Sequence, residues 1–216
     1  AEQTYLFYGP YLLGLNKMGT VPAIGANCIF RRSAIDSIGG HASGLSEDMH
    51  TGMLLHAKGW KSVYVPSVVS KGLVPWNYSG FSKQQLKWSK GTFDLLFRVY
   101  PKIFFSLSLN QKLYYLAAPL FYLYGVKSII DIVIPVIALL LLKLPLKADI
   151  FEFLLYFLPI QVIVLIFRFF NQRWLYESHE KGLFLLGGIL LKSTWWVSTL
   201  GLIYSILGRK VPFIPT

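Results

Sequence analysis

The sequence predicts a mixed α/β domain over residues 1–92, followed over residues 93–216 by α-helices that lie on and in a membrane. In the first part, short apolar runs alternate with Gly and Pro, which is typical of short strands and helices joined by tight turns. In the second part the apolar runs are longer and carry few charges. Over the whole chain, 54% of the residues are hydrophobic and the mean hydropathy is +0.51. A soluble core of this size needs less apolar surface, so part of it is expected to face lipid.

Four elements are expected in the first part. In chain order they are a buried strand at 23–30, a short helix at 33–38, a helix between Ser46 and Gly59, and a strand at 60–65. Ser46 is a good N-cap because its hydroxyl can accept a hydrogen bond from the first free amides of a helix. Gly39-Gly40 and Gly59 are expected to end the helices before them, because glycine readily adopts the left-handed conformation found there.

The second part contains three kinds of segment. Residues 83–112 interleave apolar and basic side chains, so we expect them to lie along the membrane surface, divided near Pro101. Residues 113–142 and 150–170 carry few charges, and each is long enough for a spanning helix of about 20 residues. Residues 183–207 are apolar but have polar side chains at their centre, which leaves their type ambiguous.

Positive charge helps to choose the topology, because cytoplasmic loops are enriched in Lys and Arg. With two spans, the first domain and residues 168–181 and 209–210 share the cytoplasmic side, and only the two lysines of the 143–147 turn lie outside. With three spans, residues 209–210 would lie outside. We therefore expect two spans and an amphipathic third segment.

The charge balance narrows the range of partners. The chain has 21 Lys and Arg against 10 Asp and Glu, a net charge of +11, which suits an anionic lipid surface or a phosphate-bearing substrate. We expect no nucleic acid partner, because no basic run or RNA-binding motif accompanies this charge. Cys28 is the single cysteine, and no histidine has thiols near it at metal-site spacing. The chain begins at Ala1 with no signal-like segment, so we expect it to be a piece of a longer protein.

Asp48 is the candidate general base. A reaction in which a hydroxyl attacks, such as inverting glycosyl transfer, needs a base that takes the proton of that hydroxyl, and a carboxylate commonly fills this role. Asp48 follows the expected N-cap, Ser46, where the helix dipole and free amides favour the ionised form. Helix capping by Glu47 and Asp48 alone is the simpler interpretation of this triplet.

A second polar cluster comes from Gln84, Lys87 and Trp88, which a helix would place close together on one face. The indole of Trp88 can stack on a sugar ring, the amide of Gln84 can bind hydroxyl groups, and Lys87 can neutralise a diphosphate. The alternative is an interfacial helix with an anchoring tryptophan and a lysine that reaches toward the headgroups.

These clusters belong to a longer series of motifs. In order, the series is Gly25-Ala26-Asn27, Arg31-Arg32, Gly39-Gly40, Ser46-Glu47-Asp48, Gly59-Trp60, Gly72-Leu73-x-Pro75 and Gln84-x-x-Lys87-Trp88-x-x-Gly91. Order and spacing over roughly seventy residues are far more specific than any one triplet. The series resembles the second half of the catalytic domain of a processive family-2 glycosyltransferase of the cellulose synthase type. The likeness continues to the C-terminus, where Phe213-x-Pro215-Thr216 resembles the start of the family's gating loop.

The resemblance implies a role for each matching residue. Asp48 matches the family's catalytic base in its Thr-Glu-Asp motif, with Glu47 as a supporting residue and Ser46 in place of Thr. Gly25 and Asn27 match a Gly-Thr-Asn segment beside the acceptor sugar.

Gln84, Lys87 and Trp88 match the family's Gln-x-x-Arg-Trp motif. This match implies that Gln84 and Trp88 bind the acceptor and that Lys87 lies at the nucleotide diphosphate. Lys87 keeps the charge of the family's arginine but loses its two-pronged geometry, which weakens a diphosphate clamp.

The resemblance also implies a divalent metal, Mg²⁺ or Mn²⁺. The family's uridine-binding Asp and its metal-binding Asp-x-Asp motif lie in the N-terminal half of the catalytic domain, and no segment of this sequence matches them. We expect no metal ligand in this chain, and we expect it to be inactive without the upstream half of the same enzyme.

The resemblance therefore implies a partial GT-A-type domain with interfacial and transmembrane helices, in a multi-pass protein of the plasma (inner) membrane whose catalytic part is cytoplasmic. It implies transfer from a UDP-sugar donor to the end of a growing β-glycan, coupled to translocation across the lipid bilayer. A β-glucan is the favoured product, and hyaluronan-like, chitin-like and mannan products stay open. Two alternatives remain: a non-processive membrane glycosyltransferase that acts on a lipid or short glycan, and a non-catalytic transport or scaffold protein.

Overall fold

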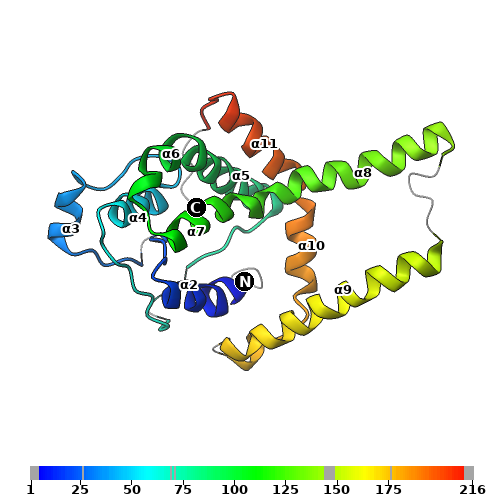
Figure 1. Ribbon diagram of the computed structural model, residues 1–216, viewed down its shortest axis with the longest axis horizontal. Helices are drawn as coiled ribbons and strands as arrows, with labels where there is room; N and C mark the ends of the chain where they lie inside the picture. The colour runs from blue at the N-terminus through cyan, green and yellow to red at the C-terminus, as the bar shows by residue number, and fades with distance from the viewer. Residues whose placement is uncertain are drawn as a thin grey trace.

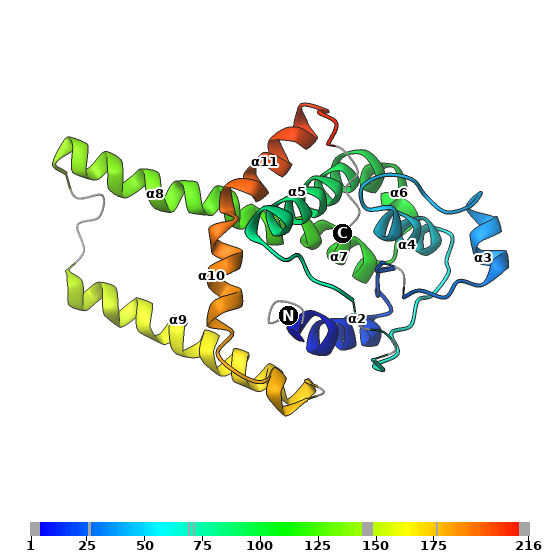
Figure 2. The same cartoon turned by 180° about the vertical axis from the view of Figure 1, so that it is seen from behind.

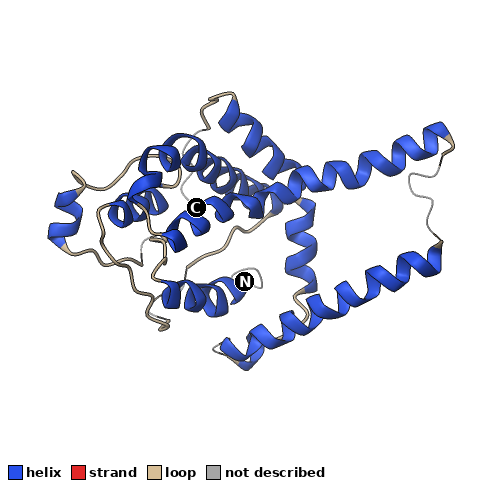
Figure 3. Ribbon diagram, in the orientation of Figure 1, coloured by secondary structure: helices blue, strands red, loops and turns tan. Residues whose placement is uncertain are grey.

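The computed structural model describes residues 5–25, 27–68, 70, 72–143, 149–175 and 177–211. These residues form helices and loops, and none of them is in a β-strand (Figure 3). Figure 1 shows a body that contains helices α2 to α7, from which α8 and α9 extend as two long arms. Helix α10 runs from beside α9 to α11, and α11 lies on the body (Figure 2).

The α-helices are α2 (Leu12–Met18), α3 (Arg32–Ser37), α4 (Glu47–Ala57), α5 (Tyr78–Asp94), α6 (Tyr100–Ile103), α7 (Leu109–Ala117), α8 (Tyr124–Leu141), α9 (Ile150–Asn171), α10 (Leu185–Ser193) and α11 (Trp195–Ile206). Two π-helical turns are η1 (Phe7–Tyr11) and η2 (Leu95–Val99). The 3₁₀ turns are η3 (Phe104–Ser106), η4 (Ala118–Leu123), η5 (Gln172–Trp174) and η6 (Ser178–Glu180).

The strands predicted at 23–30 and 60–65 are wrong for the residues described there, which are extended or irregular loops. A strand needs a neighbouring strand to exchange backbone hydrogen bonds, and here the backbone binds side chains instead. The amide of Tyr64 donates to Oδ1 of Asn16 at 2.9 Å, and the carbonyl of Val21 accepts from the Ser62 hydroxyl. The α/β expectation for residues 1–92 is therefore not met by these helices and loops.

The helix ends expected in the first part are confirmed. α3 ends at Ser37 and is followed by Gly39 and Gly40 with φ of +79° and +109°. α4 begins directly after Ser46, and Gly59 follows its end with φ of +82°. The Ser46 hydroxyl makes no capping hydrogen bond, so the predicted position is right and the predicted contact is wrong.

One hydrophobic core lies between α2, α4, α6 and α7. It is built from Leu12, Leu15, Val21, Met53, Leu95, Tyr100, Leu107, Tyr114 and Tyr115. His56 joins this core from α4: its Nδ1 is 2.8 Å from the Tyr115 hydroxyl and its Nε2 is 2.8 Å from the Ser62 hydroxyl. Because Ser62 donates to a carbonyl, it accepts from Nε2–H, and Nδ1 accepts from Tyr115. His56 is thus a packing residue whose two ring nitrogens both have hydrogen-bond partners.

Two helical segments are long and apolar enough to cross a membrane, as expected. They are Leu109–Leu141, which includes α7, η4 and α8, and Ile150–Trp174, which includes α9 and η5. α10 and α11 are bent by 45° at Thr194 and would make a third span only as a broken pair. The helical segment begins before residue 83, because Asn77 caps α5 by accepting from the Gly80 amide at 2.8 Å. Helical turns then continue from Tyr78 to Ser106, so Pro101, in the first turn of α6, does not interrupt the helical path as predicted.

Helix α11 packs between α5 and α8 (Figures 1 and 2). A Cβ atom on Gly125 of α8 would lie 2.4 Å from the carbonyl oxygen of Trp195, and one on Gly201 of α11 would lie 2.3 Å from Oγ of Ser89 in α5. Backbones approach this closely only where a side chain is absent. These two glycines therefore set the spacing of the three helices.

Candidate active site

Asp48, the predicted base, lies in the first turn of α4 and contacts the predicted acceptor segment. Its Oδ2 accepts from the Gly25 amide at 2.6 Å, and its Oδ1 accepts from the Met49 amide at 2.7 Å. Gly25 has φ of +55°, a left-handed conformation that aims its amide at the carboxylate. Glu47 precedes Asp48 at the first position of the helix, where its carbonyl accepts from the Thr51 hydroxyl.

Asn27 extends the same loop, two residues after Gly25. Its Oδ1 accepts from the Ser70 hydroxyl at 3.0 Å. Ala26, between them, lies outside the described residues. The loop thus touches Asp48 at one end and the segment that leads to α5 at the other.

Tyr8 is a residue near Asp48 that the sequence motifs did not indicate. The pKa of its phenol is raised, first by burial and then by the negative charge of Asp48 and by Cys28. Its carbonyl accepts from the Tyr64 hydroxyl at 2.5 Å, which ties η1 to the 60–65 loop. The only local signal was an aromatic run at residues 5–8, and the approach to Asp48 depends on tertiary packing.

The residues of the second cluster share one face of α5. Gln84, Lys87, Trp88 and Gly91 follow one another at i, i+3, i+4 and i+7, all within the helix Tyr78–Asp94. Trp88 is 40% exposed, and Gln84 and Lys87 are half-buried. The face therefore presents an open indole beside an amide and a cation.

The two motifs meet where Ser46 packs on Gly91. A Cβ atom on Gly91 would lie 2.1 Å from Oγ and 3.1 Å from Cβ of Ser46, and 3.3 Å from Cβ of Leu45. Ser46 precedes Asp48 by two residues, and Gly91 follows Trp88 by less than one turn. The motif face of α5 is thus turned toward the start of α4. Among the described residues no hydrogen bond joins Asp48 to Gln84 or Trp88.

The described residues contain no group of three or more His, Cys, Asp or Glu side chains that could hold a metal ion. Asp48 and Glu47 do not make a magnesium or manganese site by themselves, since such ions take several oxygen ligands in a defined geometry.

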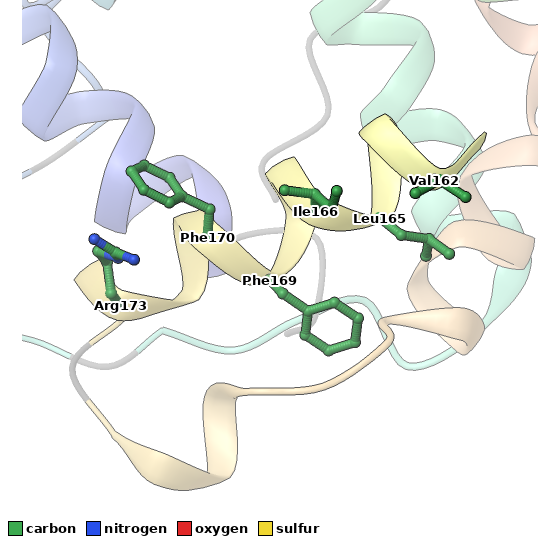
Figure 4. A pocket seen from close by; sticks show the side chains of 6 residues that line it. All are labelled: Val162, Leu165, Ile166, Phe169, Phe170 and Arg173. Carbon is green, nitrogen blue, oxygen red and sulfur yellow. The ribbon is translucent and has the colours of Figure 1, made fainter. Parts of the chain in front are cut away.

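A shallow groove on α9 is lined by residues other than those of the two motifs. Val162, Leu165, Ile166, Phe169, Phe170 and Arg173 line it, and the Arg173 guanidinium lies 3.9 Å from the centre of the Phe170 ring (Figure 4). The groove contains none of the predicted site residues and is apolar except at Arg173.

Comparison with known families fits this geometry. The family model described as "Glycosyl transferase family group 2" matches residues 5–207. The chain therefore belongs to this glycosyl transferase family.

Within the family, the chain is similar to cellulose synthases. It is 31% identical over 126 residues to the UDP-forming cellulose synthase catalytic subunit of Xanthomonas axonopodis pv. citri (strain 306), a match that covers 58% of this chain and 17% of that protein. It is 36% identical over 90 residues to a UDP-forming cellulose synthase catalytic subunit of Dictyostelium discoideum, covering 41% and 8%. The corresponding protein of Komagataeibacter sucrofermentans is 32% identical over 132 residues, covering 60% and 17%. The matched part is less than a fifth of each relative's length.

Proposed function

We propose that this chain is part of a membrane glycosyltransferase that transfers a sugar, with inversion, from a UDP-sugar to the end of a growing β-glycan and passes the product into the membrane. The favoured product is a β-glucan, in line with its similarity to cellulose synthases. The observation that carries this proposal is the packing of Ser46 on Gly91, which brings the Ser46-Glu47-Asp48 and Gln84-x-x-Lys87-Trp88 motifs side by side.

In this proposal, Asp48 is the base. The amides of Gly25 and Met49 donate to its two oxygens and hold the carboxylate in place. Each carboxylate oxygen has a second lone pair, so Asp48 can still accept the proton of an attacking sugar hydroxyl. Glu47 supports the turn that holds it.

The neighbouring groups bind the reactants in the same proposal. Trp88 stacks on the acceptor sugar, Gln84 binds its hydroxyl groups, and Gly25 and Asn27 line the acceptor side. Lys87 faces the nucleotide diphosphate as a point charge and stabilises the leaving group.

We propose further that the first part completes a GT-A-type α/β domain with an upstream half of the same enzyme. Loop residues leave large apolar side chains exposed, among them Ile29 at 102%, Val63 at 74% and Leu73 at 89%. Exposed apolar surface of this kind is unusual unless another surface covers it. That half would supply the ligands of a Mg²⁺ or Mn²⁺ ion.

The membrane setting follows from the two apolar arms. α8 and α9 present apolar side chains on all sides outside the body, which suits lipid. We place the protein in the plasma (inner) membrane with its catalytic part in the cytoplasm.

Asp48→Asn tests the function in the complete protein. In membrane vesicles supplied with UDP-glucose, this isosteric change should reduce glycan synthesis by about 10³-fold, because the base is lost. Asp36→Asn, which removes an exposed carboxylate of α3, should leave synthesis unchanged. Full activity of Asp48→Asn would support the non-catalytic alternative. Products that carry a single added sugar, in an otherwise active wild type, would support the non-processive one.

A further inference from the structure

A row of three charged side chains connects α5 to the C-terminal end of α11. Lys90, Asp94 and Arg98 follow one another at four-residue intervals along α5 and η2, so they share one stripe. The Asp94 carboxylate binds Lys90 through Oδ2 and Nη1 of Arg98 through Oδ1, the latter at 3.0 Å. The Lys90 side chain is only 6% exposed and that of Asp94 21%. This triad is partly withdrawn from water.

Ser205 of α11 completes the cluster with both its side chain and its backbone. Its hydroxyl donates to Oδ1 of Asp94 at 2.7 Å, and its carbonyl accepts from Nη2 of Arg98 at 3.0 Å. Carbonyl groups in the last turn of a helix lack partners within the helix, and a cation there also favours the negative end of the helix dipole. Arg98 thus caps the C-terminal end of α11, and Asp94 holds the Ser205 side chain beside it.

An ion pair of the same spacing on α3 differs in its surroundings. The side chains of Arg32 and Asp36 are more than half exposed, and such pairs contribute little to stability. Removal of the Asp94 charge would instead leave Lys90 buried without its counter-charge, which is strongly unfavourable. The burial of the cluster indicates that it fixes the two helices relative to each other.

The cluster acts on the same helix that carries the acceptor-binding face. Ser89 donates to the carbonyl of Ser198 at 3.0 Å, and Gly201 lies directly against Ser89. One side of α5 therefore packs on α11, while Gly91, on another side of α5, packs on Ser46. Fixing the contact with α11 sets the rotation of α5 about its axis, and with it the direction of Gln84, Lys87 and Trp88.

We propose that Asp94 is a positioning residue: through Lys90, Arg98 and Ser205 it holds α5 on α11 so that the Gln84, Lys87 and Trp88 face stays aligned with Asp48. This inference rests on the proposed function for its effect on turnover, but its structural effect can be measured without any activity.

The structural test is amide hydrogen exchange of the complete protein in detergent. Asp94→Asn should raise exchange about tenfold over the second half of α5 and the last turns of α11, and it should leave α2 and α7 unchanged. Asp36→Asn, which breaks an exposed pair of the same spacing on α3, is the matched control and should change neither helix. Unaltered exchange in α5 for Asp94→Asn would overturn the proposal.

The kinetic test uses turnover per folded protein in membrane vesicles. Asp94→Asn should reduce turnover about tenfold or more, because small displacements of binding groups are costly, and Asp94→Glu should restore most of it. Ser205→Ala removes only one hydrogen bond and should give a smaller loss in the same direction, which keeps the test valid if Asp94→Asn fails to fold. Unchanged turnover per folded protein with a lowered melting temperature would reduce Asp94 to a purely structural role. Failure of the proposed function would show separately, as an active Asp48→Asn variant.

Discussion

The hydroxyl of Ser46 lies directly over the Cα of Gly91, with no room between them for a methyl group. This contact joins the start of α4, which carries Asp48, to the helix α5, which carries Trp88. Ser46 stands at the N-cap position of α4, but its hydroxyl makes no capping bond. Instead, Ser46 packs against the Cα of Gly91.

Gly91→Ala should separate the two motifs. The added methyl group would meet Oγ and Cβ of Ser46, and overpacking of this kind costs about 1–3 kcal/mol or shifts the helices. Glycan synthesis should therefore fall about tenfold or more. The measurement is turnover in membrane vesicles with UDP-glucose.

Two further variants make the Gly91 test specific. Gly14→Ala, in a helical position with no atom within 4 Å of the new methyl group, should keep full activity and gain about 0.5–1 kcal/mol of stability. Ser46→Ala combined with Gly91→Ala removes the nearest clash and should recover part of the activity. If Gly91→Ala alone retains wild-type turnover, the contact is not needed for the reaction.

Local signals explain which elements the sequence could predict. The ends of α3 and α4 depend on glycines close to the helix end, and the two candidate spans depend on long apolar runs. Each signal lies within one segment. The strands at 23–30 and 60–65 depended instead on a neighbouring strand, and such a partner is not visible in the segment itself.

The same distinction between signals within one segment and contacts with distant residues applies to the candidate site. The spacing of Gln84, Lys87 and Trp88 correctly predicted a shared helix face. The direction of that face could not be predicted, because it depends on the contact between Ser46 and Gly91. The four-residue spacing of Lys90 and Asp94 was also present in the sequence. Ser205, which connects this pair to α11, lies 111 residues beyond Asp94 and could not be linked to it from the sequence.

Gly125→Ala should loosen the packing of α8 on α11. The new methyl group would lie 2.4 Å from the carbonyl oxygen of Trp195 and 3.0 Å from the Thr199 amide, and neither backbone atom can move independently. We expect a loss of about 1–3 kcal/mol of stability, measured as a lower melting temperature in detergent. Gly188→Ala in α10, where nothing lies within 4 Å, should melt no earlier than the wild type. Equal melting of the two variants would contradict the close approach of α8 and α11.

His56 should make the stability depend on pH. Burial lowers its pKa from 6.5 to about 4, so between these values the unfolded state binds more protons than the folded state. The free energy of unfolding should therefore fall as the pH drops from about 6.5 to 4, by about 3 kcal/mol in total. Above pH 6.5 this group should have no effect. The measurement is the melting temperature in detergent across this range.

His56→Gln tests the source of that dependence. An uncharged amide can accept from Tyr115 and donate to Ser62, as the neutral imidazole does. The variant should lose most of the slope between pH 6.5 and 4. His179→Gln, at an exposed position, should keep the slope. A wild-type slope in His56→Gln would assign the pH dependence to other groups.

The third apolar segment, residues 183–207, should not cross the membrane. α10 and α11 have 9 and 12 residues and bend by 45° at Thr194, whereas a spanning helix needs about 20. The Tyr124 hydroxyl donates to the Leu191 carbonyl, and the Tyr78 hydroxyl donates to the Ser193 carbonyl. Tyrosine side chains thus satisfy the backbone carbonyls at the bend. We therefore expect α11 to stay packed on α5 and not to enter the lipid.

Cysteine labelling can decide this topology. In a Cys28→Ser background, Lys143→Cys should react with a membrane-impermeant maleimide from outside the cell, because it lies between the two spans. Arg209→Cys should react only after the cells are permeabilised, in keeping with the location of basic residues on the cytoplasmic side. Labelling of Arg209→Cys from outside intact cells would mean that residues 185–206 span the bilayer. The packing of α11 on α5 would then have to be formed within the membrane.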